Sequence, residues 1–345
     1  MSGGDIPMAA STRSKPASLS CPLIAADVGG THARLALVDA SRGAPQVELH
    51  GYRRYSCADY PSLAAILSDF IAEQGLETRP EAAIAIAGLL VGDTLVHANL
   101  PWSVSVSGTA ADAELAGLRL INDFEAMAWA VPSINLRQAR RICGPEIAVQ
   151  PGPAMMIGPG TGFGAALRVP GDPPVVVATE AGHAALSVRD PRELQVLSVL
   201  MKRWSHVGNE RVLSGPGLVN AYEALCEIEG IEPRLDTPAR ITHAAQTGDD
   251  PLAAEALSMF CSILASVAGD LALTFGAKSV YLAGGIPAQI ADFLLAGDFA
   301  SRFVDKGVMS EVLARVPVYL VEHGQLGLLG AATWYLEQRR ADAMA

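Results

Sequence analysis

The sequence predicts an α/β protein built as two halves that flank a cleft. Residues 23–39 read as an apolar strand, a glycine turn and a second strand, and residues 154–169 repeat that pattern. In each half the strands come first and a helix follows, and the order restarts after about residue 133. A chain of 345 residues is also long for one core, which favours two domains.

The first glycine turn contains Gly29, Gly30 and Thr31. Paired glycines leave main-chain N–H groups bare, so an anion can approach the backbone closely. Asp27, at the end of the preceding strand, is suited to hold a metal ion or its waters beside that anion. Taken alone, the same residues also suit a plain β-hairpin, and this alternative stays open.

The second glycine turn, in residues 154–169, changes the balance because two such turns suggest two halves that face one ligand. Its glycines and threonine are Gly158, Gly160, Thr161, Gly162 and Gly164. No Gly-Lys-Ser/Thr follows either turn, and no G-x-G-x-x-G opens a helix. A P-loop and a Rossmann dehydrogenase are therefore disfavoured.

The remaining elements follow from apolar spacing and from glycine and proline positions. Residues 61–74 place apolar side chains on one helical face, and residues 251–275 read as one long helix rich in small residues. Further helices are expected at 124–131, 191–207, 218–229, after Pro287, and at 326–339. Further strands are expected at 82–87, 91–98, 118–121, 175–178, 280–283 and 316–321, with a domain crossing and an outer strand in 132–153.

Three polar or glycine-containing stretches allow two interpretations each. Asn122 and Asp123 follow a strand directly, so they can cap the next helix, serve a ligand at the sheet edge, or both. The segment Glu180–His183 can be ordinary surface or part of a site. Gly284-Gly285 can serve tight strand-to-helix packing, or let a flat base or ribose lie close to the backbone.

Composition narrows the class of protein. A formal net charge of −11 and a pI near 5.1 argue against general binding to nucleic acid or to anionic membranes. The five cysteines are scattered without C-x-x-C spacing, which predicts neither a disulfide framework nor a zinc site and favours the reducing cytoplasm. Residues 1–22 are expected to be a disordered leader, and the apolar run 257–268 a buried helix rather than a membrane span.

Together these stretches resemble the bacterial glucokinase family of actin-like sugar kinases, from about Leu23 to the last helix. The resemblance rests on an ordered set of stretches: residues 27–31 (DVGGT), 121–124 (INDF), 158–164 (GPGTGFG), 180–183 (EAGH), 210–220 (ERVLSGPGLVN) and 282–285 (LAGG). It implies the duplicated actin-like ATPase fold, which is ribonuclease H-like. A small domain would comprise residues 23–133 plus 323–345, and a large one residues 134–322.

The family resemblance also implies an activity, ATP-dependent phosphorylation of the 6-hydroxyl of D-glucose to glucose 6-phosphate, with Mg²⁺ as cofactor. Asp123 matches the catalytic base. The sugar-binding positions that it implies are Asn122, Asp123, Glu180, His183 and Glu210. Those that it implies for ATP are Ala26, Asp27, Val28, Gly29, Gly30, Thr31, Gly160, Thr161, Gly162, Gly284 and Gly285, with Asp27 holding Mg²⁺ through water. A homodimer is common in the family.

Two residues depart from the family pattern: His32 stands where Asn is usual, and Ala181 replaces a usual Gly. Three rival interpretations are weaker. Kinases of the repressor/open-reading-frame/kinase family commonly carry a cysteine-rich zinc motif after the sugar-binding His, and residues 184–191 contain no Cys. A sugar-sensing transcriptional regulator needs a DNA-binding module. A polymerising actin-like ATPase leaves Glu180, His183 and Glu210 unexplained.

Overall fold

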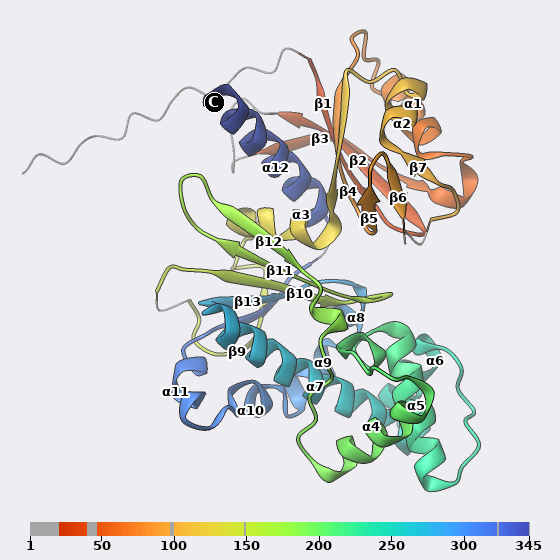
Figure 1. Ribbon diagram of the computed structural model, residues 1–345, viewed down its shortest axis with the longest axis vertical. Helices are drawn as coiled ribbons and strands as arrows, with labels where there is room; N and C mark the ends of the chain where they lie inside the picture. The colour runs from red at the N-terminus through yellow and green to blue at the C-terminus, as the bar shows by residue number, and fades with distance from the viewer. Residues whose placement is uncertain (1–20, 40–46, 97–99, 148–149, 323, 345) are drawn as a thin grey trace, which may run out of the picture.

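The computed structural model describes residues 21–39, 47–96, 100–147, 150–322 and 324–344. The expected leader lies, up to residue 20, outside the described residues. Within them the chain forms two mixed sheets, one above the other, with helices between and below them (Figure 1). The first sheet belongs to the N-terminal half of the chain and the second to the C-terminal half.

The first sheet has the strand order β3-β2-β1-β4-β8. Strands β1 (Leu23–Val28), β2 (His32–Asp39) and β3 (Glu48–Ser56) form an antiparallel meander, while β4 (Glu81–Ile86) and β8 (Gly117–Asn122) continue from β1 in parallel. Helices α1 (Leu63–Glu73) and α2 (Val106–Asp112) and a small sheet of β5 (Leu89–Val91), β6 (Thr94–Val96) and β7 (Val104–Ser105) complete this half.

The second sheet repeats the arrangement in the order β12-β11-β10-β13-β14-β9. Strands β10 (Ala154–Pro159), β11 (Phe163–Val169) and β12 (Val175–Thr179) form the meander. Strands β13 (Ser279–Leu282) and β14 (Val318–Leu320) run parallel to β10, and β9 (Arg140–Cys143) adds the outer strand. The predicted duplication of an α/β unit is therefore confirmed.

Two helices lie between the sheets. Helix α12 (Leu326–Met344) packs on β1 and β4 of the first sheet, and α3 (Asp123–Trp129) packs on β10, β11 and β12 of the second (Figure 1). The two helices also pack on each other, and at their crossing a Cβ added to Gly330 would overlap the carbonyl oxygen of Ala126. Their backbones are thus in direct contact, which only glycine permits at this position.

Helix α7 (Pro251–Phe275) is the central helix of the second half, with the bounds that the sequence predicts. It is the one helix among the described residues that is long and apolar enough to cross a membrane, but 72% of its most apolar window is buried inside the protein. Around it pack α5 (Gly215–Glu229), α6 (Pro238–Thr247) and α10 (Phe299–Val304). The expectation of a buried core helix is confirmed.

Several predicted boundaries were wrong by a few residues, each for a local reason. Helix α5 begins at Gly215 rather than 218 because the Ser214 hydroxyl accepts a hydrogen bond from the Gly217 N–H. Helix α4 (Pro191–Arg203) ends four residues early, since Trp204 is already extended. The strand expected at 91–98 is the hairpin β5–β6, which turns at Gly92 with φ of 60°, and residues 97–98 lie outside the described residues.

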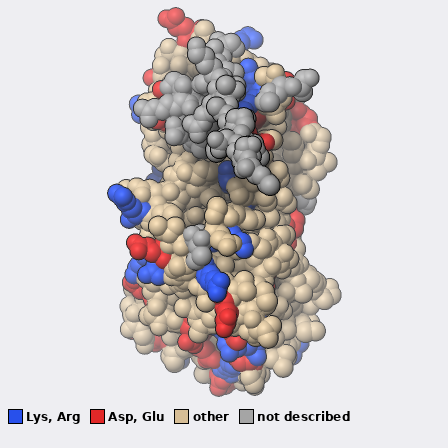
Figure 2. Space-filling view, turned by 90° about the vertical axis from the view of Figure 1, so that its left-hand side faces the viewer, with Lys and Arg blue, Asp and Glu red and all other residues tan. Residues whose placement is uncertain are grey.

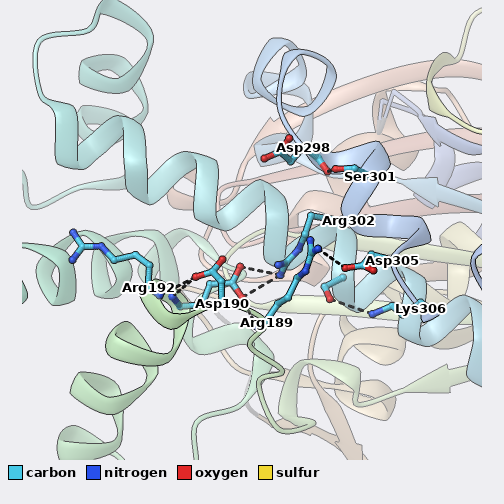
Figure 3. A network of polar contacts seen from close by, with 10 residues as sticks. Arg189, Asp190, Arg192, Asp298, Ser301, Arg302, Asp305 and Lys306 are labelled. Atoms are coloured by element: carbon cyan, nitrogen blue, oxygen red, sulfur yellow. Dashed lines mark hydrogen bonds and ion pairs between the residues drawn. The ribbon is translucent and has the colours of Figure 1, made fainter.

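A buried ion pair ties α4 to α10. Arg302 Nη2 lies 2.8 Å from Glu193 Oε1, and both side chains are almost wholly buried. Figure 3 shows the surrounding charged groups, in which Arg189 pairs with Asp305 at 2.7 Å and Lys306 donates to Ser266 at 3.2 Å. Short helices α8 (Gly285–Gln289), α9 (Ala291–Ala296) and α11 (Ser310–Leu313) complete this end of the second half. On the face drawn in Figure 2, cationic and anionic side chains are interspersed rather than separated by sign.

Substitution of Gly330 tests the helix crossing. In an exposed helix Gly→Ala normally stabilises by about 1 kcal/mol. Here we expect Gly330→Ala to lower the free energy of unfolding by about 1–3 kcal/mol, because the methyl group forces α12 away from Ala126. Denaturant titration measures the difference. Gly324→Ala is the matched control, since an added Cβ there meets no atom within 4 Å; a stabilised Gly330→Ala protein would contradict the crossing.

Candidate active site

The first glycine turn joins β1 to β2. The hairpin register sets Arg34 directly opposite Asp27, and Arg34 Nη1 lies 3.2 Å from Asp27 Oδ2. Asp27 is only 5% exposed, and Gly327 at the start of α12 packs so closely on it that an added Cβ would lie 2.7 Å from the Asp27 Cγ. The Gly29 N–H donates to the His32 carbonyl at 3.0 Å, which closes the turn.

Asp27 is a suitable outer ligand for Mg²⁺. This cation prefers one or two carboxylates together with water and phosphate oxygens. Because one Asp27 oxygen already receives the Arg34 guanidinium, the donor set fits an ion held through water. Another possible metal-ligand group among the described residues, Asp39, Glu48 and His50, lies at the opposite end of the β2–β3 pair and does not belong to this site.

Asn122 and Asp123 end β8 and begin α3. Asn122 Oδ1 accepts from the N–H groups of Phe124 and Glu125 at 3.0 and 3.1 Å, so Asn122 is the N-cap. In the parallel register Val28 is level with Ile86, and Ile86 with Asn122. Two strand spacings place Asn122 about 10 Å from the end of β1. The first glycine turn and Asp123 therefore occupy one edge of one sheet.

Phe124, the residue after Asp123, joins this end of the first sheet to the second sheet. An added Cβ at Gly158 would lie 2.7 Å from the Phe124 ring, and one at Gly164 would overlap that ring. The two glycines face each other across the β10–β11 hairpin, because Gly158 and Gly164 are register partners. They create the space that the Phe124 ring fills, which fixes the start of α3 against the second glycine turn.

The second glycine turn is held by two backbone hydrogen bonds, one of which comes from the start of α5. The Gly160 N–H donates to the Gly162 carbonyl, and the Gly215 N–H at the start of α5 donates to the Gly160 carbonyl, both at 2.8 Å. Gly284 follows β13 at the same edge with φ of 104°, and an added Cβ would lie 3.2 Å from the Pro159 carbonyl oxygen. Glycine is therefore required at 284 by backbone conformation and close packing.

The three acidic and histidine positions expected to bind sugar lie on two short turns that meet. Glu180 precedes the first of these turns, Ala181–His183, and Glu210 lies in the second, Asn209–Arg211. His183 Nδ1 is 3.6 Å from Glu210 Oε1, and an added Cβ at Gly162 would lie 3.2 Å from Glu210 Oε2. The Glu180–His183 segment and Glu210 thus border the second glycine turn.

The structure accordingly collects the predicted residues into two groups. Around the second turn it brings Gly160–Gly162, Gly284-Gly285, the Glu180–His183 segment and Glu210. At the facing edge of the first sheet it places Ala26–Thr31 and Asn122. Asp123 lies between the two groups, next to the Phe124 contact. It is half-buried, and its Oδ1 accepts from the Phe124 N–H at 2.9 Å.

Sequence reasoning missed three supporting residues. Arg34 was predictable, because a tight β1–β2 hairpin places it opposite Asp27. Phe124 gave no local signal, since its partners Gly158 and Gly164 lie more than thirty residues away. Asn209 also gave none: its side chain is buried, and Nδ2 donates to the Ala181 carbonyl at 2.9 Å, which holds together the turns Ala181–His183 and Asn209–Arg211.

Comparison with known proteins identifies the family. The sequence model of the glucokinase family matches residues 24–338. The chain belongs to the glucokinase family. A glucokinase-like protein of Xylella fastidiosa strain 9a5c is 45% identical over 92% of this chain and 95% of its own. A glucokinase of Nitrobacter hamburgensis is 38% identical over 93% and 99%.

Solved structures agree with the glucokinase family and with its actin-like fold. A glucokinase from an Antarctic psychrotroph has 32% identity and a TM-score of 0.79, over 92% of this chain and 99% of that one. A glucokinase of the ROK family from Streptomyces griseus, solved with glucose and AMPPNP, has 20% identity and a TM-score of 0.55, over 91% and 98%, and shows the fold alone. The protein is a sugar kinase, a transferase that acts on glucose.

The two departures from the glucokinase pattern have structural consequences. The Ala181 side chain is 7% exposed and packs into the core of the second half, so its methyl group is accommodated. His32 Nε2 lies 2.9 Å from Arg54 Nη2. Loss of hydration, then the charges of Arg54 and Arg34, lower the pKa of His32 below its ordinary 6.5, which favours the neutral ring that accepts from Arg54.

A pH titration of stability tests this environment of His32. A base whose pKa is lowered by folding stabilises the protein above its unfolded pKa, and that contribution is lost as the pH falls. We expect native protein to lose more stability between pH 7 and 5 than His32→Asn, in which this titration is absent. Denaturation midpoints at each pH measure the difference. His243→Asn, an exposed substitution on α6, should track the native protein; equal acid sensitivity of all three would contradict the assignment.

Proposed function

We propose that this protein transfers the γ-phosphoryl group of ATP to the 6-hydroxyl of D-glucose, with Asp123 as general base. The observation that carries the proposal is the position of Asp123. It begins α3 at the end of the first sheet that carries the first glycine turn, and the next residue, Phe124, contacts Gly158 and Gly164 of the second turn, which Glu210 borders at Gly162. A group at that position can reach both a bound sugar and the terminal phosphate of a nucleotide.

Asp123 supplies the proton acceptor. A hexose hydroxyl is a poor nucleophile at neutral pH, so transfer requires a base within hydrogen-bond reach of the attacking oxygen. Asn122 caps α3 and Asp123 is the first residue of that helix, so the cap fixes where the Asp123 carboxylate starts. The Phe124 ring on Gly158 and Gly164 prevents the start of α3 from shifting away from the second turn.

The glycine turns hold the phosphates. The backbone of Gly29–Thr31 and of Gly160–Gly162 would approach them from the two sheets, and Gly284-Gly285 would lie near the adenosine. The Gly29 and Gly160 N–H groups close the turns, so the donors would be other N–H groups of these segments. Bound Mg²⁺ would neutralise charge on the β- and γ-phosphate oxygens, held through water by Asp27. Arg34 orients the Asp27 carboxylate and prevents it from rotating.

The sugar would be recognised by hydrogen bonds to several of its hydroxyl groups. Asn122, Glu180, His183 and Glu210 provide both hydrogen-bond donors and acceptors, and a site of this kind penalises analogues that lack one hydroxyl. The Asn209 clamp on Ala181 fixes the spacing of the two turns that carry these groups. Closure of the halves over both substrates would exclude water and limit ATP hydrolysis.

The wider setting follows from the same proposal. The protein would act in the cytoplasm, feed glycolysis and form a homodimer. Residues 23–133 with 323–345 would form the small domain and 134–322 the large one. The packing of α12 on β1 and β4 supports this division, because it joins the C-terminal helix to the first sheet.

Replacement of Asp123 tests the general base. We expect Asp123→Ala to reduce kcat by roughly 10²–10⁴-fold while glucose binding changes much less, because the base acts on the attacking oxygen in the transition state. Coupled ADP-release assays over a panel of hexoses measure kcat, KM and substrate choice together. Asp112→Ala, at the end of α2, is the control. Near-native turnover of Asp123→Ala would remove this role, and ADP release independent of glucose would overturn the substrate.

Glu180→Gln tests the assignment of the two ligands. The change keeps the shape of the side chain and removes a charged acceptor, so we expect the KM for glucose to rise by about tenfold and the KM for ATP to change little. Steady-state kinetics with each substrate varied in turn measures both. A larger rise in the KM for ATP than in the KM for glucose would contradict the assignment of the Glu180–His183 segment to the sugar.

A further inference from the structure

A separate cavity lies in the second half, between the C-terminal end of α7, the start of β13 and α11. Its volume is about 270 Å³, which is room for about nine water molecules at ~30 Å³ each. Lys278 lines it directly before β13, whereas Gly284 lies beyond the other end of that strand. Six residues at about 3.3 Å each put the cavity about 20 Å from Gly284. It does not belong to the proposed active site.

The lining of this cavity is apolar except for one amide and two cations. Ala272, Leu273, Ala277, Met309, Val312, Leu313 and Val316 supply most of the apolar wall. Gln150, Lys278 and Arg315 supply the polar side chains, and among the described residues no carboxylate lines the cavity.

Neither cation has a partner in the described part of the chain. Lys278 and Arg315 make no side-chain hydrogen bond or ion pair there, whereas neighbouring cations do. Lys306, for example, lies 2.7 Å from Asp270 on α7. At the end of α7 the Ala272 carbonyl accepts from the Ala277 N–H at 2.9 Å.

We propose that this cavity binds a small organic anion with a compact apolar body, such as a medium-chain carboxylate or alkyl phosphate. Its anionic head would bind Lys278 and Arg315, and its apolar body would fill the cavity and contact the apolar side chains of α7 and α11. The apolar surface continues from Met309, which lines the cavity and is 40% exposed, to Val308 outside it, which is 95% exposed. A ligand tail that covers these side chains gains hydrophobic free energy in addition to the charge contact.

The size of the cavity limits the ligand. Sites for drug-sized molecules occupy about 300–1,000 Å³, so this cavity suits a body at or below the small end of that range. A sugar phosphate would leave the apolar wall in contact with hydroxyl groups. A nucleotide is larger than the cavity and is therefore excluded.

Calorimetric titration of the full-length protein with octanoate, octyl phosphate and octanol tests the proposal. Saturable binding of an anion, at least about tenfold tighter than octanol, is the expected result. The comparison of octanoate with octyl phosphate distinguishes a carboxylate from a phosphate ligand. Equal affinity for octanol would overturn the role of the cations, and absence of saturable binding of both anions would overturn the site.

Two pairs of variants locate the binding. Lys278→Gln with Arg315→Gln should weaken anion binding by at least about tenfold, and Lys202→Gln with Arg137→Gln, two exposed cations elsewhere, should not. Val312→Trp should block the cavity, since Val312 lines it and is 45% exposed, while Ile231→Trp, at a 50% exposed position outside the lining, should not. Glucose-dependent turnover confirms that each variant is folded. Unchanged affinity in both lining variants would exclude this cavity.

Discussion

The arrangement of this protein depends on one short helix held between two sheets. Helix α3 has seven residues, too few to be stable alone, and it is fixed by contacts at Phe124 near its start and at Ala126 in its middle. Near its start the Phe124 ring fills the space above Gly158 and Gly164, and further along its backbone touches Gly330 of α12. Because each contact requires a glycine on the partner, there is little room for α3 to move relative to either sheet.

The position of α3 determines the geometry of the site. Asp123 is the first residue of the helix, so any shift of α3 moves the carboxylate directly. The Phe124 contact ties it to the turn of the second sheet, and α12 ties it to the first sheet through β1 and β4. The duplicated strand order then places the two glycine turns at the edges that α3 joins. A kinase of the glucokinase family needs this arrangement, since base, sugar and phosphate must meet at one point.

The glycines of this chain illustrate how one residue type serves different physical needs. Gly29 and Gly30 shape a hairpin turn that the Gly29 N–H closes on the His32 carbonyl, and Gly284 adopts a backbone conformation closed to other residues. Gly158 and Gly164 make room for an aromatic ring, and Gly330 for another helix. In the sequence all of them interrupt apolar runs in the same way. Only the atoms that surround each glycine in the folded structure show why glycine is needed there.

By itself the sequence determined what depends on residues close along the chain. The two hairpins, the bounds of α7 and a helix cap at Asn122 or Asp123 follow from turn residues, helical spacing and caps, which act over a few residues. The structure shows that Asn122 is the cap. The ordered motifs also indicated the glucokinase family. Tertiary structure alone decided the Phe124 contact, the meeting of His183 with Glu210, and the cavity with Lys278 and Arg315. These join segments 27 to more than 30 residues apart, and no local spacing encodes which distant surfaces pack together, because that is decided by burial and shape once the chain has folded.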